Sequence, residues 1–129
     1  MKVNSLGSSS IDVSAVCLGS MTWGTQNDQQ DANAQIEFAL DRGVNFIDTA
    51  EMYAVPPSPE TYGTTESIIG NWIADNPTRR GEFVLATKIA GNGLPWVRQG
   101  KDIDAAAVKK SIDDSLKRLQ TDYIDLYQL

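Results

Sequence analysis

Three side chains of this sequence could together transfer a proton: a carboxylate, a phenol and an ammonium. Asp48 and Tyr53 belong to the stretch GVNFIDTAEMY, and Lys88 ends the later stretch FVLATK. An ammonium beside a phenol makes the phenol a stronger acid, because the positive charge stabilises the phenolate. Such a phenol could protonate a carbonyl oxygen while a hydride reaches the carbonyl carbon.

Each of these three residues also has an ordinary structural interpretation. An aspartate at a strand end is often a turn former. A tyrosine is often a half-buried packing residue, and a lysine at a strand end is often solvated. Spacing alone does not decide between the two interpretations, so the question becomes whether the fold brings the three side chains together.

Strands and helices alternate along the chain, which predicts a parallel sheet with right-handed crossovers. We predict a small β-hairpin within 2–13, strands at 14–20, 44–49, 82–88 and 123–129, and helices at 28–42, 64–76 and 104–119. Neighbouring parallel strands lie about 4.8 Å apart, and their carboxyl ends share one edge of the sheet. We therefore expect Asp48 and Lys88, at the ends of two successive strands, to lie side by side.

Helical periodicity also predicts which side chains form the core. On the third helix the apolar positions are Val108, Ile112, Leu116 and Leu119, and we expect them to form its buried side. The single cysteine, Cys17, stands in the apolar run AVCL and is interpreted as a small core side chain. One cysteine also excludes a disulfide within the chain.

Two architectures fit this order of elements: a small open doubly wound sheet, or the first half of a (β/α)8 barrel. A dinucleotide-binding open sheet needs the motif GxGxxG after its first strand, where this chain has GSMTWG. The segment from Gly91 to Gly93 begins a similar motif, but it follows the third strand and has Trp96 in place of the third glycine. The barrel is therefore the favoured fold.

Composition excludes several classes of function. The 129 residues include 11 basic and 17 acidic side chains, and the net charge of −6 opposes binding to nucleic acid. No segment approaches the roughly 18 apolar residues of a membrane span, and the start lacks the apolar core of a signal peptide. We expect a cytoplasmic protein. The absence of histidine excludes imidazole catalysis and imidazole metal sites, and we expect no metal.

Several motifs resemble those of the aldo-keto reductase family. They are the stretch 43–53 followed by the Tyr62-Gly63 pair and by 66–70, together with three further landmarks at 18–24, 86–88 and 122–129. The landmarks follow one another in the family's order, and the resemblance covers nearly the whole chain. The proline-rich insertion at 55–60 is most similar to one bacterial branch of the family.

The resemblance implies a (β/α)8 barrel that reduces aldehydes or ketones reversibly with NADP(H). It implies that Tyr53 is the general acid, that Lys88 strengthens its acidity, and that Asp48 holds Lys88. The expected cofactor-binding residues are Met21, Thr22, Trp23 and Asp48. The expected substrate-binding residues are Trp23, Tyr53 and Trp96. For Trp23 and Trp96, loop packing is an equally good interpretation.

In the family, a catalytic histidine directly follows the strand with which this chain ends at Leu129, and later strands supply most cofactor contacts. We therefore expect 1–129 to be the N-terminal half of a single barrel domain, inactive alone. An unclosed sheet exposes two edges, so we expect a complementary C-terminal fragment or self-association. A non-catalytic NADP(H)-binding subunit, regulatory or structural, and a self-associating half-barrel remain alternatives.

Overall fold

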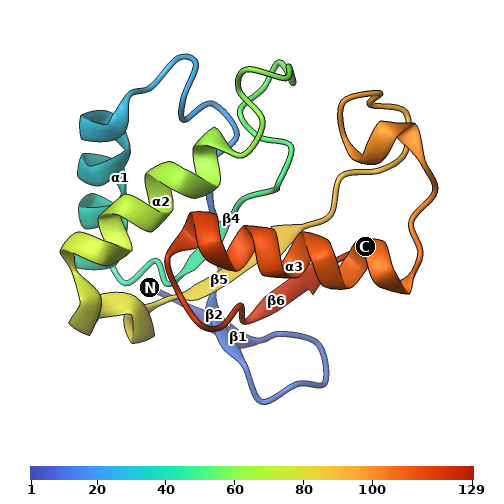
Figure 1. Cartoon of the computed structure of the whole chain (residues 1–129). Coiled ribbons are helices and arrows are strands. Elements are labelled where there is room, and N and C mark those ends of the chain that lie inside the picture. Colours follow the sequence, from blue (N-terminus) through green and yellow to red (C-terminus); the bar gives the residue numbers. More distant parts are fainter.

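The computed structural model describes all residues from 1 to 129 and contains two sheets. The first is the antiparallel hairpin of β1 (Val3–Ser5) and β2 (Asp12–Ser14). The second is a parallel sheet with the order β3 (Leu18–Gly19), β4 (Phe46–Asp48), β5 (Val84–Lys88) and β6 (Leu126–Gln128). The connections contain α1 (Gln29–Asp41), α2 (Thr64–Asp75), α3 (Ala105–Leu119) and the 3-10 turns η1 (Pro77–Glu82) and η2 (Arg98–Gly100). The predicted α/β order is confirmed (Figure 1).

Local sequence signals explain where the helices begin and end. Asp28 caps α1: its carboxylate accepts a hydrogen bond of 2.9 Å from the Asp31 N–H, and the Asp31 carboxylate accepts one from the Asp28 N–H. Gly43 ends the same helix with a φ of 74°, which a residue without a Cβ adopts easily. Asp104 caps α3 by accepting from the Ala107 N–H at 2.7 Å.

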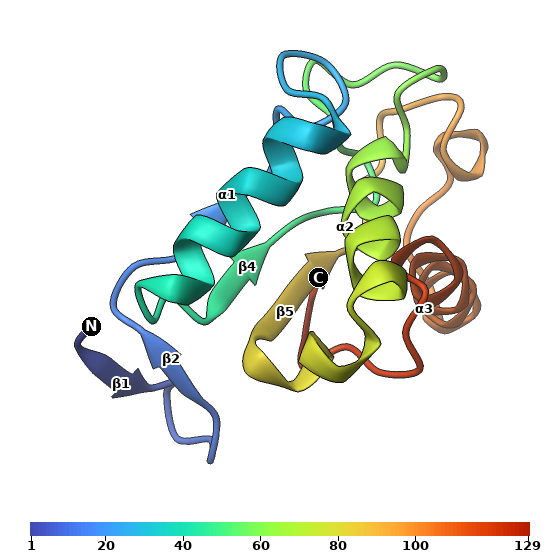
Figure 2. The same cartoon turned by 90° about the vertical axis from the view of Figure 1, so that its left-hand side faces the viewer.

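The three helices cover one side of the curved sheet, and the hairpin lies at the end of the sheet opposite to the long loops (Figure 2). The side chain of Asn45, just before β4, holds the hairpin by accepting from the Ser14 N–H and donating to the Asp12 carbonyl. The hairpin therefore closes the amino end of the strands, away from the candidate site.

Alternate residues of the strands point to opposite faces of the sheet. The face that meets the helices is apolar and contributes to one core cluster: Trp23, Ala32, Ile36, Ile47, Ile68, Ile69, Trp72, Ile73, Phe83, Leu85 and Leu119. The opposite face carries Asp48, Lys88 and Gln128, which are all half-buried. In a closed barrel this second face lines the interior. The polar side chains at its carboxyl edge would therefore all face the mouth of the barrel.

Helices α2 and α3 approach each other closely at Gly70. A Cβ on Gly70 would lie 2.0 Å from the Arg118 carbonyl oxygen and 2.9 Å from the Leu119 carbonyl carbon. Only a residue without a side chain fits this contact. The close approach fixes which side of α3 faces the core.

The predicted buried side of α3 is wrong for three of its four residues. Val108, Ile112 and Leu116 are half-exposed, whereas Ser111 and Ser115 are buried together with Leu119. The contact at Gly70 turns the Leu119 side of α3 toward α2, and on the same side of the helix the Ser111 hydroxyl donates to the buried Glu51. Periodicity identified an apolar side of the helix, and the fold buries the neighbouring side.

The predicted first strand, 14–20, is also shorter than expected, and its cysteine is exposed. β3 contains two residues, Ser14 belongs to the hairpin, and the side chains of Val16 and Cys17 lie at the surface. β3 pairs only with β4, so its other side has no neighbouring strand. A groove of about 520 Å³ runs there, between Leu18 and Phe38 of α1. The core position predicted for Cys17 is therefore wrong.

None of the helices is both long and apolar enough to cross a membrane.

Candidate active site

Asp48 and Lys88 form an ion pair at the carboxyl edge of the parallel sheet. The Lys88 Nζ donates to the Asp48 Oδ2 over 2.7 Å and to the Thr49 carbonyl oxygen over 2.9 Å. The two side chains are 29% and 31% exposed, so the pair faces the open side of the sheet without being buried in it. The sequence predicted this juxtaposition from the strand ends alone, and the structure confirms it.

Tyr53 reaches the same ammonium from the loop after β4. The Lys88 Nζ lies 4.8 Å from the centroid of the Tyr53 ring, which is within the range of a cation–π contact. The Tyr53 hydroxyl makes no hydrogen bond within the chain, and Tyr53 is half-buried. Asp48 and Thr49 use two of the three ammonium protons, so one remains for a further acceptor.

Backbone hydrogen bonds fix the turn that carries Tyr53. The Thr49 N–H donates to the Ala86 carbonyl at 2.9 Å, and the Glu51 N–H donates to the Lys88 carbonyl at 3.1 Å. The Tyr53 N–H then donates to the Ala50 carbonyl at 3.1 Å. The turn is thus joined to β5, the strand that supplies the ammonium.

Two further residues hold Asp48, and the sequence analysis did not identify either as a site residue. The Gln128 Nε2 donates to the Asp48 Oδ1 at 3.1 Å, and the Ser20 Oγ donates to the Asp48 carbonyl at 2.7 Å. For Gln128 a signal was available, because Lys88 pairs with Gln128 in the parallel register and paired residues point to the same face. The carboxylate therefore has one oxygen for the ammonium and one for the amide.

The other predicted site residues lie in different surroundings. Met21 is 51% exposed, and the Thr22 hydroxyl donates to the Asn27 side chain at 2.8 Å. Trp96 is 42% exposed in the loop between β5 and α3. Trp23 is only 1% exposed, and its indole N–H donates to Gln35 at 3.0 Å. The Trp23 ring fills the core between α1 and the sheet, which favours the packing interpretation; its contact with cofactor or substrate stays a prediction.

A buried carboxylate, Glu51, lies in the turn between Asp48 and Tyr53. It is 1% exposed and accepts from the Ala90 N–H at 2.7 Å, from the Arg98 Nη1 at 2.6 Å and from the Tyr62 hydroxyl at 3.1 Å. The Ser111 hydroxyl of α3 donates to it as well. Burial acts to raise the pKa of Glu51, but the hydrogen bonds from Ser111, Arg98 and Ala90, with the charge of Arg98, hold it below its ordinary value. Glu51 is therefore a charged, fully partnered group.

The pKa of Tyr62, which lies beside the same carboxylate, is raised. Its burial, together with the neighbouring charge of Glu51, raises the pKa of Tyr62 to about 12. At neutral pH Tyr62 is a hydrogen-bond donor to Glu51, a role that its place in the Tyr62-Gly63 motif does not reveal.

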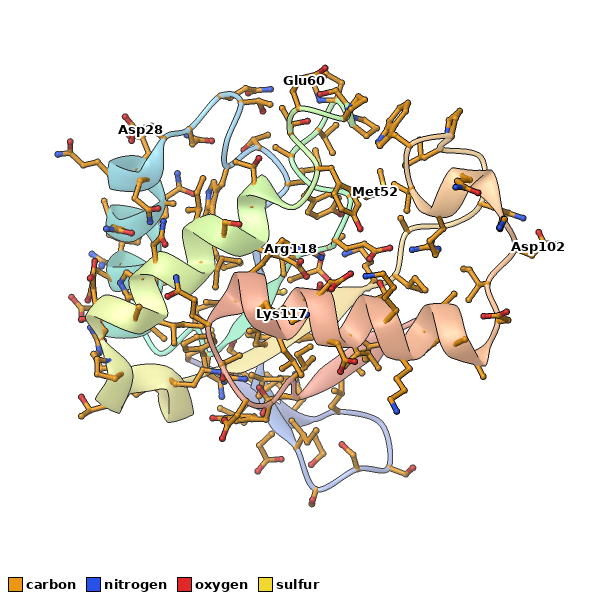
Figure 3. The ribbon with its side chains drawn as sticks, in the orientation of Figure 1. Asp28, Met52, Glu60, Asp102, Lys117 and Arg118 are labelled. Carbon is orange, nitrogen blue, oxygen red and sulfur yellow. The ribbon has the colours of Figure 1, made fainter.

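A second buried carboxylate, Glu66 of α2, joins three elements. It accepts from the Thr87 hydroxyl of β5 at 2.6 Å and from the Arg118 Nε of α3 at 2.7 Å. Figure 3 shows Arg118 on the side of α3 that faces α2, whereas Lys117, 77% exposed, lies on the outer side. The Glu66 carboxylate accepts its hydrogen bonds from β5 and α3 and none from the turn of Tyr53, so it is a useful reference for Glu51.

The larger grooves of the structure lie elsewhere. One of about 720 Å³ lies between Ile73 of α2, Arg80 and Leu116 of α3, at the amino end of the sheet, and the groove beside β3 is the other. The candidate site is thus an open polar surface at the carboxyl edge. The structure has no group of three or more acidic or thiol side chains that could hold a metal ion.

A phenol, an ammonium and a carboxylate lie together at the carboxyl ends of parallel βα units, the face at which (β/α)8 barrels carry their active sites. The model of the aldo/keto reductase family matches residues 15–129. The chain therefore belongs to this family, whose fold is a (β/α)8 barrel, and it forms the N-terminal portion of that fold. The predicted family and fold class are confirmed.

Curated relatives agree with this assignment. The chain is 45% identical over 132 residues to Protein tas of Escherichia coli K12, which confirms the expected bacterial branch. It is 39% identical over 134 residues to the uncharacterized oxidoreductase YrpG of Bacillus subtilis, and 39% identical over 126 residues to the 6-dehydroglucose reductase of Novosphingobium aromaticivorans. These matches cover 100%, 100% and 96% of the chain but 38%, 40% and 40% of the relatives. The chain thus spans well under half the length of the relatives.

Proposed function

We propose that the full-length protein is an NADP(H)-dependent oxidoreductase that reduces aldehydes or ketones to alcohols, with Tyr53 as its general acid. The observation that carries the proposal is the position of the Lys88 ammonium, 2.7 Å from Asp48 and 4.8 Å from the Tyr53 ring centroid. Family membership and the relatives named as an oxidoreductase and a reductase support it.

The three residues have separate roles in this reaction. The Tyr53 hydroxyl donates no hydrogen bond within the chain, so its proton is available to a substrate carbonyl oxygen. As the proton leaves, negative charge develops on the phenol oxygen, and the Lys88 ammonium stabilises it. Asp48 keeps the ammonium in place with one oxygen, and Gln128 orients that carboxylate through the other. NADPH, when bound, supplies the hydride to the carbonyl carbon.

We propose that the nicotinamide end of the cofactor binds at the carboxyl edge of the sheet. Gly19 pairs with Asp48 in the register, and no atom lies within 4 Å of where a Cβ on Gly19 would be. This leaves open space beside Asp48, next to the exposed side chain of Met21 and the loop of Thr22. Lys88 and Arg98 are each paired with a carboxylate, so we propose that phosphate recognition belongs to the remainder of the barrel.

The test is NADPH oxidation by the full-length protein with a panel of aldehydes and ketones, comparing the wild type with Tyr53→Phe. Removal of the hydroxyl is expected to lower kcat by about 10²–10⁴-fold, the typical contribution of a general acid. Tyr123→Phe is the matched control, because Tyr123 is 42% exposed and lies beside Arg80, away from the site. Equal turnover of wild type and Tyr53→Phe would remove the assigned role.

Cofactor binding separates this proposal from the non-catalytic alternative. Quenching of protein fluorescence by NADPH measures binding without any reaction. Binding without turnover of any carbonyl compound by the wild type would indicate an NADP(H)-binding subunit instead.

A further inference from the structure

The buried charge of Glu51 is the feature that the proposed reaction does not use. A carboxylate is unfavourable inside a protein unless its charge is paired and its oxygens are hydrogen-bonded. Glu51 meets both conditions with donors from four segments: the loop before α2, the loop after β5, η2 and α3. A side chain that only filled space here would need none of these donors.

The position of Glu51 in the chain connects these donors with the candidate site. Its backbone N–H donates to the Lys88 carbonyl, and Tyr53 follows two positions later in the same turn. Its side chain accepts from the Ala90 N–H, two residues after Lys88, and from Arg98. One residue thus joins the turn of the phenol to the loop that begins two positions after the ammonium.

The loop between β5 and α3 has few other polar links to the body of the protein. Gly91, Asn92 and Gly93 are exposed, and the hydrogen bond from Asn92 to Asp102 stays within the loop. Val97 is 5% exposed and provides an apolar anchor, and the next residue, Arg98, binds both Glu51 and the Ala90 carbonyl. The Glu51–Arg98 ion pair is therefore the main charged link of this loop, which also carries Trp96.

We propose that Glu51 is a positioning residue that locks the Tyr53 turn and the Trp96 loop into one arrangement. The inference rests on the proposed function. The backbone of Glu51 belongs to the turn of the proton donor Tyr53, and its side chain holds the Trp96 loop, which we place as a wall of the substrate space. A loop held only in part would leave that wall displaced, and displacements of about 1 Å lower rates strongly.

The test compares Glu51→Gln with Glu66→Gln in the full-length protein. Both residues are buried carboxylates that bind an arginine and a hydroxyl group, but only Glu51 contacts the turn and the loop. We expect Glu51→Gln to lower kcat/KM about tenfold to a hundredfold, and Glu66→Gln to leave it within about twofold. Equal effects of the two variants on kcat/KM would overturn the proposal.

A measurement of loop mobility gives a readout that does not depend on turnover. Trp23 and Trp72 are each 1% exposed and Trp96 is 42% exposed, so acrylamide reaches Trp96 selectively among these three rings. The quenching that disappears in a Trp96→Phe background belongs to Trp96. We expect this component to increase in Glu51→Gln and to stay unchanged in Glu66→Gln; an unchanged component in both would contradict the proposal.

The partner of Glu51 supplies a second variant if Glu51→Gln does not fold. Arg98→Met removes the charge of the pair, and Arg98→Lys keeps it. We expect both readouts to change in Arg98→Met and to recover partly in Arg98→Lys; wild-type values in Arg98→Met would overturn the proposal. A wild type without carbonyl turnover would remove the proposed function, whereas the quenching comparison would still decide the role of Glu51 in holding the loop.

Discussion

Lys88 donates to Asp48 across two neighbouring strands over 2.7 Å, although the residue that pairs with Asp48 in the register is Ala86. The long side chain of Lys88 reaches back over the two positions between Lys88 and Ala86. Its ammonium therefore lies beside the Asp48 carboxylate and against the Tyr53 ring. Both groups are about 30% exposed, and ion pairs with this much solvent contribute little to stability. The importance of the pair is that it holds the Lys88 ammonium beside the Tyr53 ring.

Removal of that charge is expected to impair the reaction more than the fold. In Lys88→Met we expect kcat to fall by about 10²-fold or more, because the phenol loses the ammonium that stabilises its ionised form. Steady-state turnover and thermal unfolding of the full-length protein measure the two effects. Lys110→Met is the control, since the Lys110 side chain is 74% exposed on α3. A large loss of stability with unchanged kcat would contradict this division.

The close contact of α2 and α3 predicts a strong effect of one methyl group. Gly70→Ala places a Cβ against the Arg118 carbonyl, and we expect a destabilisation of about 1–3 kcal/mol, as for other overpacked sites. Gly81→Ala adds the same group where no atom lies within 4 Å, and it should leave the stability unchanged. Denaturant unfolding of the two full-length variants makes the comparison; equal stabilities would show that the helices can separate without cost.

The buried pair of Glu66 and Arg118 predicts non-additive stability effects. Arg118→Met leaves the Glu66 carboxylate, 0% exposed, without its cation, and we expect a loss of about 3–5 kcal/mol. Combining Arg118→Met with Glu66→Gln removes the unpaired charge, so the double variant should be more stable than Arg118→Met alone. A double variant as unstable as the sum of the single variants would indicate that the two side chains are not coupled.

Tyr62 predicts a pH dependence of stability at alkaline pH. Its pKa in the folded protein is raised to about 12, whereas a tyrosine in an unfolded chain ionises near 10. The folded state therefore keeps a proton that the unfolded state loses. This contribution is complete below about pH 10 and is lost as the pH rises toward about 12.

Unfolding of the full-length wild type and of Tyr62→Phe across this pH range tests the contribution. The difference in free energy of unfolding between them is expected to shrink from about pH 10 to about pH 12, because the variant has no proton to lose. Tyr123→Phe, at an exposed position, should parallel the wild type. A constant difference across the range would exclude the shift.

The unpaired edges of β3 and β6 predict how residues 1–129 behave in isolation. Each edge strand has one neighbour, and open edges pair with other chains. We expect the isolated segment to associate with itself or with the C-terminal part of the barrel, and to show no carbonyl reduction. Analytical ultracentrifugation and the NADPH assay measure both properties; a folded monomer with turnover would contradict both expectations.

Much of the fold and of the site could be predicted because the signals are local. The Asp28 cap, the stop at Gly43 and the apolar runs before Asp48 and Lys88 set the elements, and parallel strands bring their carboxyl ends together. Gln128 required the register of two strands, which no single stretch encodes. The donors around Glu51 lie as far along the chain as Ser111, so only the folded chain reveals that this side chain is buried and charged.

The incorrect predictions also depend on contacts between distant parts of the chain, which no single stretch of sequence encodes. Helical periodicity located an apolar stripe on α3, but the choice of the buried side came from the glycine contact with α2, a tertiary effect. Cys17 lies in an apolar run that fits a buried strand, but β3 is at the edge of the sheet. The family resemblance places Trp23 near cofactor or substrate, with packing as the equal alternative, and the structure places its ring in the core.

The strands of the parallel sheet follow one another in space in the same order as along the chain, from β3 to β6. During synthesis, each strand that leaves the ribosome therefore meets the edge formed by the strand before it. Each pairing joins distant residues, Leu18 with Ile47, Ile47 with Leu85 and Ala86 with Leu126, and such long-range parallel pairing forms slowly. The ion pair of Asp48 and Lys88 can form as soon as β5 is released, before β6 is complete. The Asp48–Lys88 pair thus belongs to the part of the sheet that is synthesised first, and the free edge of that part can serve as the template on which the remaining strands are added.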